Sequence, residues 1–278
     1  MKSSVVAVLT MKPVEFFGLN PVFTKTEFAA RTAADKVAGR RTVDSLLAYH
    51  VRTGRLLRLR RGLYAVVGPW ASSGTQPVDS FLVAAKLAED AVLAYHTALE
   101  FHGKAYSVHE RLNYLTASAA RPFQFRSQTF RGVPFPQALV ARGQGLFEVK
   151  TLERAGVGVR VTSLERCLVD VLDRPDLGGG WEEIWRSLEL VEFFDLDRAI
   201  DYALLLQNAT TAAKVGLFLE QHRDVLMVED KHLQPLSERR PRSPHYLERQ
   251  HKKDSRLVAE WNLIVPQRIL DRAWEEVL

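Results

Sequence analysis

The feature that most limits how this chain can fold is a helical segment followed at once by two short basic strands. Residues 40–53 place apolar side chains at the spacing of one helix face: Val43, Leu46, Leu47 and Val51. Gly54 stands where a glycine commonly ends a helix. Residues 55–60 and 63–67 then alternate in the manner of strands around the turn Arg61-Gly62. The pattern predicts a β-hairpin directly after a helix.

Two shorter helical segments precede this pair. Residues 13–31 contain a proline suited to a first helical turn, a turn at Asn20-Pro21 and capping threonines at positions 24 and 26. Three helices and a hairpin, in this order, predict a winged helix-turn-helix over residues 1–68.

The run from Gly68 to Pro77 holds two prolines, two glycines and three Ser or Thr residues, so we expect a linker over residues 69–77.

The charge of the chain is distributed unevenly. Its formal net charge is +5, but residues 1–68 hold twelve Lys or Arg and only four Asp or Glu. Residues 69–230 are acidic overall, and residues 231–256 are basic again, with eight basic against three acidic side chains. A basic N-terminal end favours nucleic acid or an acidic partner, and double-stranded DNA fits the predicted fold.

Candidate DNA-binding side chains follow from the predicted helix and hairpin. The apolar face of the helix turns Arg41, Ser45, Tyr49 and Arg52 outward, and Arg60 lies at the hairpin tip. Helix residues of this kind can contact base edges, and arginines of a wing can contact phosphate. The complete predicted set is Lys25, Thr26, Arg40, Arg41, Thr42, Ser45, Tyr49, Arg52, Arg58, Arg60 and Arg61. Secondary phosphate contacts are expected at Arg239, Arg240 and Arg242.

The remainder, residues 78–278, is expected to be a mixed α/β domain with a helical C-terminal part and a basic connector at 231–256. The strand candidates are Leu112–Thr116, Phe123–Phe130, Ala138–Val140 and Val157–Val161. One cysteine, Cys167, favours a reducing compartment. No apolar run approaches the ~18 residues of a membrane span. We therefore expect a cytoplasmic α+β protein without a membrane partner.

Enzymatic patterns are weak in this sequence. His96 and His102 are six residues apart, which puts them on different helix faces, so no metal is predicted. Gly178–Gly180 with Asp195 and Asp197 is superficially similar to a nucleotidyltransferase, but Asp195 or Asp197 is better explained as a helix cap. Glu148-Val149-Lys150 is similar to the end of a nuclease motif, but residues 111–147 supply no second carboxylate. We expect no catalytic activity and no cofactor.

Several segments together resemble the AbiEi family of antitoxins. They are Leu59–Tyr64, Tyr95–Gly103, Val161–Asp170, Arg242–Pro244 and Trp261–Pro266, and they occur in the family's order over most of the chain. One departure is Thr97, where the family usually has serine. The resemblance implies a transcriptional autorepressor that binds inverted repeats in its own promoter and an antitoxin domain that counteracts a nucleotidyltransferase-like toxin. It also implies that this chain is not an enzyme. The alternatives are a metal-dependent DNA nuclease and a ligand-sensing transcription factor.

Overall fold

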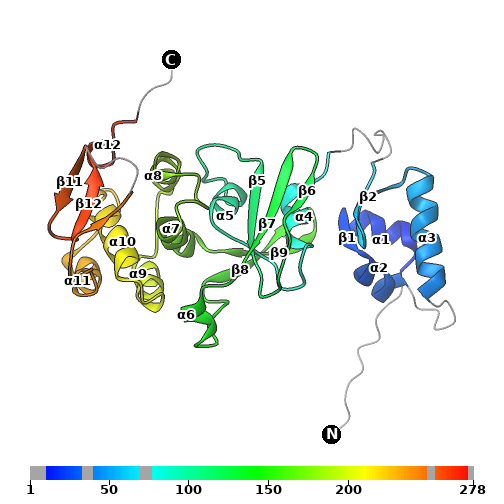
Figure 1. The fold of residues 1–278 in the computed structure, drawn as a ribbon. Helices are drawn as coiled ribbons and strands as arrows, with labels where there is room; N and C mark the ends of the chain where they lie inside the picture. Colours follow the sequence, from blue (N-terminus) through cyan, green and yellow to red (C-terminus); the bar gives the residue numbers. More distant parts are fainter. Residues whose placement is uncertain (1–10, 33–39, 69–76, 249–253, 275–278) are drawn as a thin grey trace, which may run out of the picture.

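The computed structural model of this protein describes residues 11–32, 40–68, 77–248 and 254–274, with the side chains of residues 40–42 outside the description. The architecture is a mixed α+β fold (Figure 1). Residues 11–68 form one end of the molecule and are called the N-terminal unit. Residues 77–274 form the rest and are called the main unit.

The N-terminal unit contains three helices and a three-stranded antiparallel sheet in the order β1-β3-β2. Its elements are α1 (Pro13–Leu19), β1 (Val22–Thr24), α2 (Lys25–Thr32), α3 (Arg40–Arg52), β2 (Leu56–Arg60) and β3 (Leu63–Val66). The predicted helix at 40–53 and the hairpin are confirmed. The strand β1, only three residues long, was missed because so short a run carries no periodicity.

Four phenylalanines form the centre of the N-terminal unit. Phe16, Phe17, Phe23 and Phe28 contact one another, with ring centroids 5.1–6.3 Å apart. The apolar face of α3 covers them through Val43 and Leu47, and β2 and β3 add Leu56 and Tyr64. This face of the sheet is thus buried against the unit's own helices.

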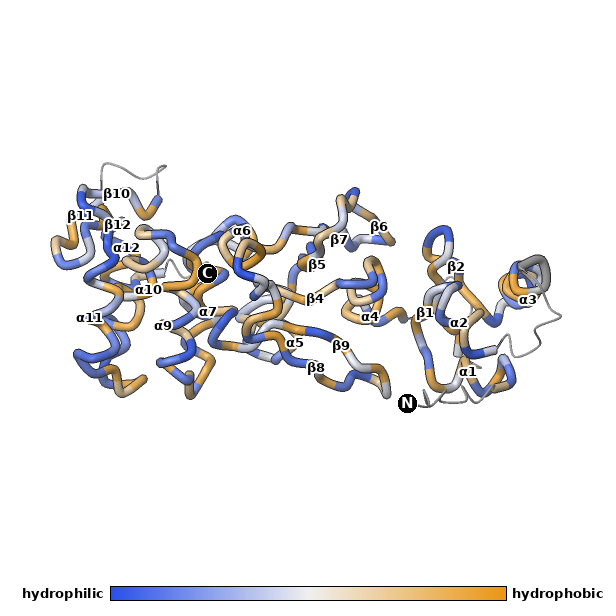
Figure 2. Tube along the Cα trace, turned by 90° about the horizontal axis from the view of Figure 1, so that it is seen from below, coloured by the Kyte–Doolittle hydropathy of each residue, from blue (hydrophilic) through white to orange (hydrophobic). Residues whose placement is uncertain are grey.

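The opposite face of the same sheet packs against the main unit. Val22, Leu59, Leu63 and Ala65 belong to the large core of the main unit rather than to the phenylalanine cluster. Figure 1 and Figure 2 both show α3 at the outer end of the molecule and the sheet turned toward the main unit. One face of the small sheet packs against the phenylalanine cluster and the other against the main core, so the sheet connects the two units.

The main unit is built on a six-stranded mixed sheet in the order β6-β7-β5-β4-β9-β8. The strands are β4 (Val92–Leu93), β5 (Arg111–Leu115), β6 (Phe123–Phe125), β7 (Gln128–Val133), β8 (Val149–Arg154) and β9 (Val157–Thr162). The helices of this part are α4 (Ser80–Ala85), α5 (His96–Phe101), α6 (Gln137–Val140), α7 (Leu164–Asp173) and α8 (Trp181–Glu189), of which α4 and α5 pack against the sheet.

Two of the predicted strands are wrong in detail. The run Phe123–Phe130 is a hairpin, β6 and β7, because Arg126 adopts a positive φ of 54° and turns the chain. The run Ala138–Val140 is a helix, α6, which starts directly after Pro136. Apolar runs this short do not distinguish strand from helix by periodicity.

The C-terminal part is mainly helical and carries a small three-stranded sheet. Its elements are α9 (Leu196–Leu205), α10 (Ala209–Gln221), α11 (Asp230–Glu238), β10 (His245–Tyr246), β11 (Ser255–Val258), β12 (Leu263–Pro266) and α12 (Gln267–Leu270). Trp261 fixes this sheet to α10, since its ring covers Gly216 and its Nε1 donates to Glu220 Oε2 at 2.7 Å. Within the described residues, no helix combines the length and the apolar character that a membrane span requires.

Candidate nucleic-acid interface

A groove of about 740 Å³ runs between α2, α3 and the β2–β3 hairpin. Five of the predicted DNA-binding residues line it: Lys25, Thr26, Arg52, Arg58 and Arg61. Asp44, on α3, is the acidic residue of its lining, where it pairs with Lys25. Four cationic side chains against one carboxylate leave a clear excess of positive charge. We call this feature the basic groove.

The first turn of α2 places Lys25 and Thr26 in the basic groove. Glu27 accepts hydrogen bonds from the Thr24 backbone nitrogen at 2.8 Å and from Thr24 Oγ1 at 3.1 Å, which caps the helix. The Lys25 backbone nitrogen donates to the Gly62 carbonyl oxygen at 2.8 Å. Gly62 has a φ of 81°, a conformation that favours glycine and closes the hairpin turn. The start of α2 is therefore tied to the hairpin turn.

A β-bulge at Leu59 separates two arginines that simple alternation would place together. Arg58 pairs with Tyr64, but Arg60 pairs with Leu63, so β2 has one residue more than its partner strand. Neighbouring residues of β3 face opposite sides of the sheet. Arg58 therefore lies on the groove side and Arg60 on the side of the main unit.

Arg60, which was predicted at the hairpin tip with Arg58 and Arg61, makes its contacts with the main unit. Its Nη2 donates to the Leu87 carbonyl oxygen at 2.7 Å, and its guanidinium lies 5.6 Å from the centre of the Phe123 ring. Both partners belong to the main unit. The structure thus places Arg60 at the contact between the units, whereas Arg58 and Arg61 stay in the basic groove.

The outer face of α3 carries Arg52 and two further predicted residues, Ser45 and Tyr49. Ser45, Tyr49 and Arg52 are exposed, and the Arg52 guanidinium lies 6.0 Å from the Tyr49 ring centre. His50 is buried behind them against Phe17, and burial together with the charge of Arg55 lowers the pKa of His50. The side chains of Arg40, Arg41 and Thr42 lie outside the described residues.

The three residues predicted as secondary phosphate contacts lie at the other end of the molecule. They follow α11, which lies at the end of the molecule opposite to the N-terminal unit in Figure 1. Arg240 Nη1 donates to the carbonyl oxygen of Ser237, and Arg239 lines a separate pocket beside Arg142. Arg242 is exposed. The structure does not bring these residues together with the basic groove.

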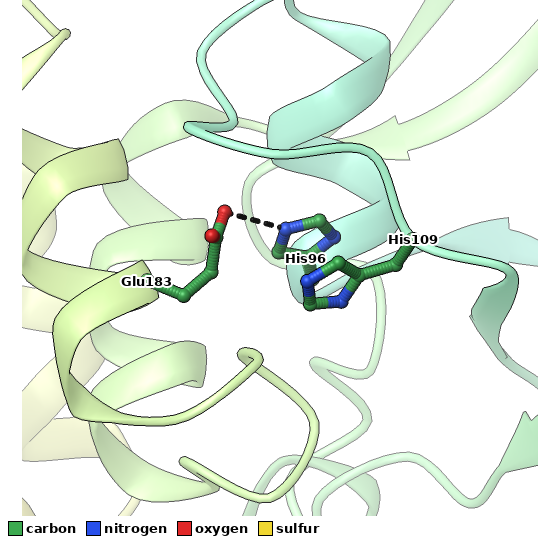
Figure 3. Close-up of side chains that lie close together, drawn as sticks. All are labelled: His96, His109 and Glu183. Carbon is green, nitrogen blue, oxygen red and sulfur yellow. Dashed lines mark hydrogen bonds and ion pairs between the residues drawn. The ribbon is translucent and has the colours of Figure 1, made fainter. Parts of the chain in front are cut away.

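A second polar cluster lies in the main unit, where α5, the loop before β5 and α8 meet (Figure 3). His96 is 1% exposed, and its Nε2 donates to Glu183 Oε1 at 2.8 Å. Its Nδ1 lies 3.0 Å from Glu100 Oε1, close enough for an ion pair although not aligned for a hydrogen bond. The His109 ring stacks on His96 with centroids 3.7 Å apart. The spacing of His96 and His102 gave no indication of this cluster, whose partners lie far apart in sequence.

The electrostatics of the cluster favour a charged His96. Burial alone would lower the pKa of His96, but the carboxylates of Glu100 and Glu183 outweigh burial and raise it. For Glu183 burial would raise the pKa, yet the bonds from His96 and from Ser107 lower it to about 2. The His109 pKa is lowered by burial and by the neighbouring His96. The two carboxylates thus favour the imidazolium form of His96.

His96, His109 and Glu183 are close enough for metal ligation, with their ligand atoms within 4.8 Å of one another. Their geometry fits an ion pair better. An imidazole binds a metal in its ring plane at about 2.0–2.1 Å, and two rings stacked 3.7 Å apart share no such point. Glu183 also already accepts hydrogen bonds from His96 and Ser107 and from the Ser187 hydroxyl.

One of the glycines that were compared with a nucleotidyltransferase, Gly179, borders this cluster. A Cβ on Gly179 would lie 2.6 Å from His109 Cε1 and 2.7 Å from Glu183 Cγ. The chain must therefore carry glycine here for the two side chains to approach. The capping interpretation of Asp195 is confirmed, since its side chain accepts from the Arg198 backbone nitrogen.

The nuclease-like segment faces a small pocket of about 340 Å³. Glu148 and Lys150 line it together with Glu165, Asp195 and Arg198, so two carboxylates come from downstream of the segment. Glu148 accepts a hydrogen bond from Arg198 at 2.5 Å, and Glu165 accepts one from the Asp195 backbone at 3.3 Å. In the part of the chain that the structure describes, these carboxylates are not gathered closely enough to hold a metal ion together.

The comparisons with known proteins concern the fold. No protein-family model matches this sequence, and no curated protein matches it. Among solved structures, the chain is similar to the crystal structure of the RV2827C protein from Mycobacterium tuberculosis. The TM-score is 0.59 at 20% sequence identity, over 93% of this chain and 92% of that chain. At this identity the similarity shows a shared fold over nearly the whole length of both chains.

Proposed function

We propose that this protein is a DNA-binding transcriptional autorepressor and antitoxin. The observation that carries the DNA-binding half is the basic groove, in which Lys25, Arg52, Arg58 and Arg61 are gathered from three elements. Cations gathered from separate elements on one surface suit the phosphate backbone of a duplex. The exposed face of α3 beside the groove offers side chains that can contact bases.

The element order supports a winged helix-turn-helix for the N-terminal unit. Its helices and strands follow the order helix, strand, helix, helix, strand, strand. The three strands form a sheet in the order β1-β3-β2, in which β2 and β3 are the hairpin. In this interpretation α3 is the recognition helix and the β2–β3 hairpin is the wing. Its partner is double-stranded DNA, the inverted repeats of its own promoter.

Binding of the promoter tests this half of the proposal. Fluorescence anisotropy would compare a promoter duplex with a scrambled duplex of equal length over a series of salt concentrations. If the four cations of the groove each neutralise one phosphate, the plot of log K against log salt has a slope of about −3.6 from the groove alone. Equal affinity for both duplexes, or an affinity independent of salt, would contradict the proposal.

The antitoxin half rests on the resemblance to AbiEi antitoxins, whose partner is a nucleotidyltransferase-like toxin. Within the segment Val161–Asp170, Arg166 and Asp170 are buried and paired with each other, so these two side chains are not available for a toxin contact. Co-expression with a toxin encoded beside this gene tests this half. We expect growth to be restored by the full chain, and continued arrest would contradict an antitoxin role.

A metal-dependent DNA nuclease is the alternative function. The grouping of Glu148, Lys150, Glu165 and Asp195 around one pocket favours it, but the ion pair of Glu148 with Arg198 opposes it. Incubation of purified protein with plasmid DNA and Mg²⁺ or Mn²⁺ separates the two functions. Cleavage that is lost in Glu148→Gln would favour the nuclease.

A further inference from the structure

Two adjacent residues of the main unit, Lys86 and Leu87, contact the N-terminal unit on the side of its sheet that faces the main unit. Lys86 pairs with Glu27 of α2, and the carbonyl oxygen of Leu87 accepts the 2.7 Å hydrogen bond from Arg60. The ring of Phe123 lies beside the Arg60 guanidinium. These polar contacts border the apolar face of the sheet that packs into the main core. We call this set of contacts the seam.

The seam continues into the basic groove through hydrogen bonds. Glu27, which pairs with Lys86, also accepts from the Thr24 backbone and hydroxyl and so caps α2. The next residue, Lys25, donates from its backbone to the Gly62 carbonyl in the hairpin turn. The Lys25 side chain pairs with Asp44 of α3. One connected set of contacts therefore runs from Lys86 to all three elements that form the groove.

Arg60 provides a second connection, through the hairpin. Because of the bulge, Arg60 is directed into the seam while Arg58 is directed into the groove. The two residues share one strand, so a shift of the backbone at Arg60 moves Arg58 as well. Lys86, Phe123 and Arg60 do not line the groove themselves.

We propose that the main unit holds the basic groove in its DNA-binding shape, with Lys86, Phe123 and Arg60 as positioning residues that do not contact the DNA. This inference rests on the proposed DNA-binding function. A groove held in its binding shape loses less conformational freedom when the duplex binds, and its affinity is higher for that reason. A variant that loosens the seam therefore loses affinity without losing a phosphate contact.

The salt dependence of DNA binding distinguishes positioning from phosphate contact. Full-length Lys86→Ala and Phe123→Leu are compared with the wild type by anisotropy on the promoter duplex at several salt concentrations. We expect both to bind about threefold to tenfold more weakly at every salt concentration, with an unchanged log–log slope. Phe123→Leu changes no charge, so its effect cannot arise from a lost phosphate contact. Lys86→Arg, which keeps the cation, should restore most of the affinity.

Two comparisons make the outcome decisive. Lys104→Ala removes another lysine of the main unit, one that pairs with Glu192 away from the seam, and should leave affinity unchanged. Arg58→Ala should reduce the magnitude of the slope by about one unit, since it removes a proposed phosphate contact. Thermal melting of each variant establishes that it is folded at the temperature of the titration.

The possible failures are separable. If the wild type does not bind the promoter with a salt-dependent affinity, the proposed function itself is wrong. If the wild type and Arg58→Ala behave as expected but Lys86→Ala and Phe123→Leu bind normally, only the positioning role is overturned. A reduced slope in Lys86→Ala would instead make Lys86 a phosphate contact and would also overturn that role.

Discussion

Arg58 and Arg60 are two residues apart in β2, yet they face opposite sides of its sheet. Simple alternation would put both basic side chains on one face, and both were predicted as DNA contacts of the hairpin. The inserted residue at Leu59 changes this, and alternation alone cannot reveal a bulge. The two arginines therefore need to be tested separately.

Replacing the arginines one at a time tests this division. Arg58→Ala and Arg61→Ala should each reduce the magnitude of the salt slope of DNA binding by about one unit, because each removes a cation from the groove. Arg60→Ala should keep the wild-type slope, since its guanidinium is engaged by Leu87 and Phe123. Anisotropy titrations at four or more salt concentrations measure all three. A reduced slope in Arg60→Ala alone would reverse the assignment.

The ion pair of His96 and Glu183 makes stability depend on pH. The lowered pKa of Glu183, about 2 against an ordinary 4.5, stabilises the fold above pH 4.5, and this stabilisation is lost as the pH falls toward 2. The raised pKa of His96 stabilises the fold below pH 6.5, and this contribution is lost as the pH rises through the raised value. Both contributions are complete between pH 4.5 and 6.5. Urea unfolding of the wild type and of Glu183→Gln should differ most in that window.

The adjacent glutamate provides a control for this pair. Glu183→Gln should lower the free energy of unfolding by about 3 kcal/mol near pH 5.5, because it leaves a buried imidazolium short of one partner. Glu182, on the same helix turn, forms a partly exposed ion pair with Arg186, and Glu182→Gln should cost less than about 1 kcal/mol. Equal losses in the two variants would show that His96 is not held as a cation.

Among the elements, the contact between α10 and the small C-terminal sheet depends on one glycine. A Cβ on Gly216 would lie 2.1 Å from the Trp261 ring, so the ring must move in Gly216→Ala. Overpacking of this kind costs about 1–3 kcal/mol, and the better helix propensity of alanine offsets only part of it. We expect a lower melting temperature and a red-shifted tryptophan emission.

A second substitution tests the cause of that loss. The atoms nearest to the new Cβ belong to the outer, six-membered ring of the Trp261 indole. The single ring of phenylalanine is smaller than the indole and does not place atoms at these positions. In Gly216→Ala combined with Trp261→Phe, the destabilisation should be smaller than the sum of the two single effects. Strict additivity would mean that the helix backbone, and not the ring, is responsible.

Elements with a strong local pattern could be predicted from the sequence. The helix α3 follows from the helical spacing of Val43, Leu47 and their neighbours, and α7 follows from the cap at Ser163. The strand β1 and the helix α6 could not be predicted, since three or four residues show no period. Short elements are determined by the contacts that cover them, and these contacts are not local.

The sites show the same limit. Lys25, Thr26, Arg52, Arg58 and Arg61 could be found because they lie on a predicted helix start, a helix face and a hairpin. The partnership of His96 with Glu183 joins residues 87 positions apart, and nothing in the local sequence connects them. A histidine in the sequence does not indicate which distant carboxylate the fold will place beside it. Only the packing of α5 against α8 creates this site.

For the whole molecule, the doubly covered sheet of the N-terminal unit implies cooperative unfolding. Leu63 and Ala65 belong to the main core, while Leu56 and Tyr64 of the same hairpin belong to the phenylalanine cluster. Separation of the units would expose the first pair to water. Calorimetry should therefore give one unfolding transition for the full chain, and Leu63→Ala should lower the whole transition. Two resolved transitions would mean that the units unfold independently.

The bulge at Leu59 has a consequence for how this hairpin can change over generations. Substitutions in β2 alter one side chain at a time, but losing one residue between Arg55 and Arg58 would move the residues before it to the opposite face of the sheet. Leu56 would then leave the phenylalanine cluster, whereas losing Leu59 would only remove the bulge, with Arg58 still opposite Tyr64 and Arg60 still opposite Leu63. Between Arg55 and Arg58, the number of residues is therefore under stricter constraint than their identity. An insertion or deletion in this stretch should be more damaging than any single exchange of its arginines.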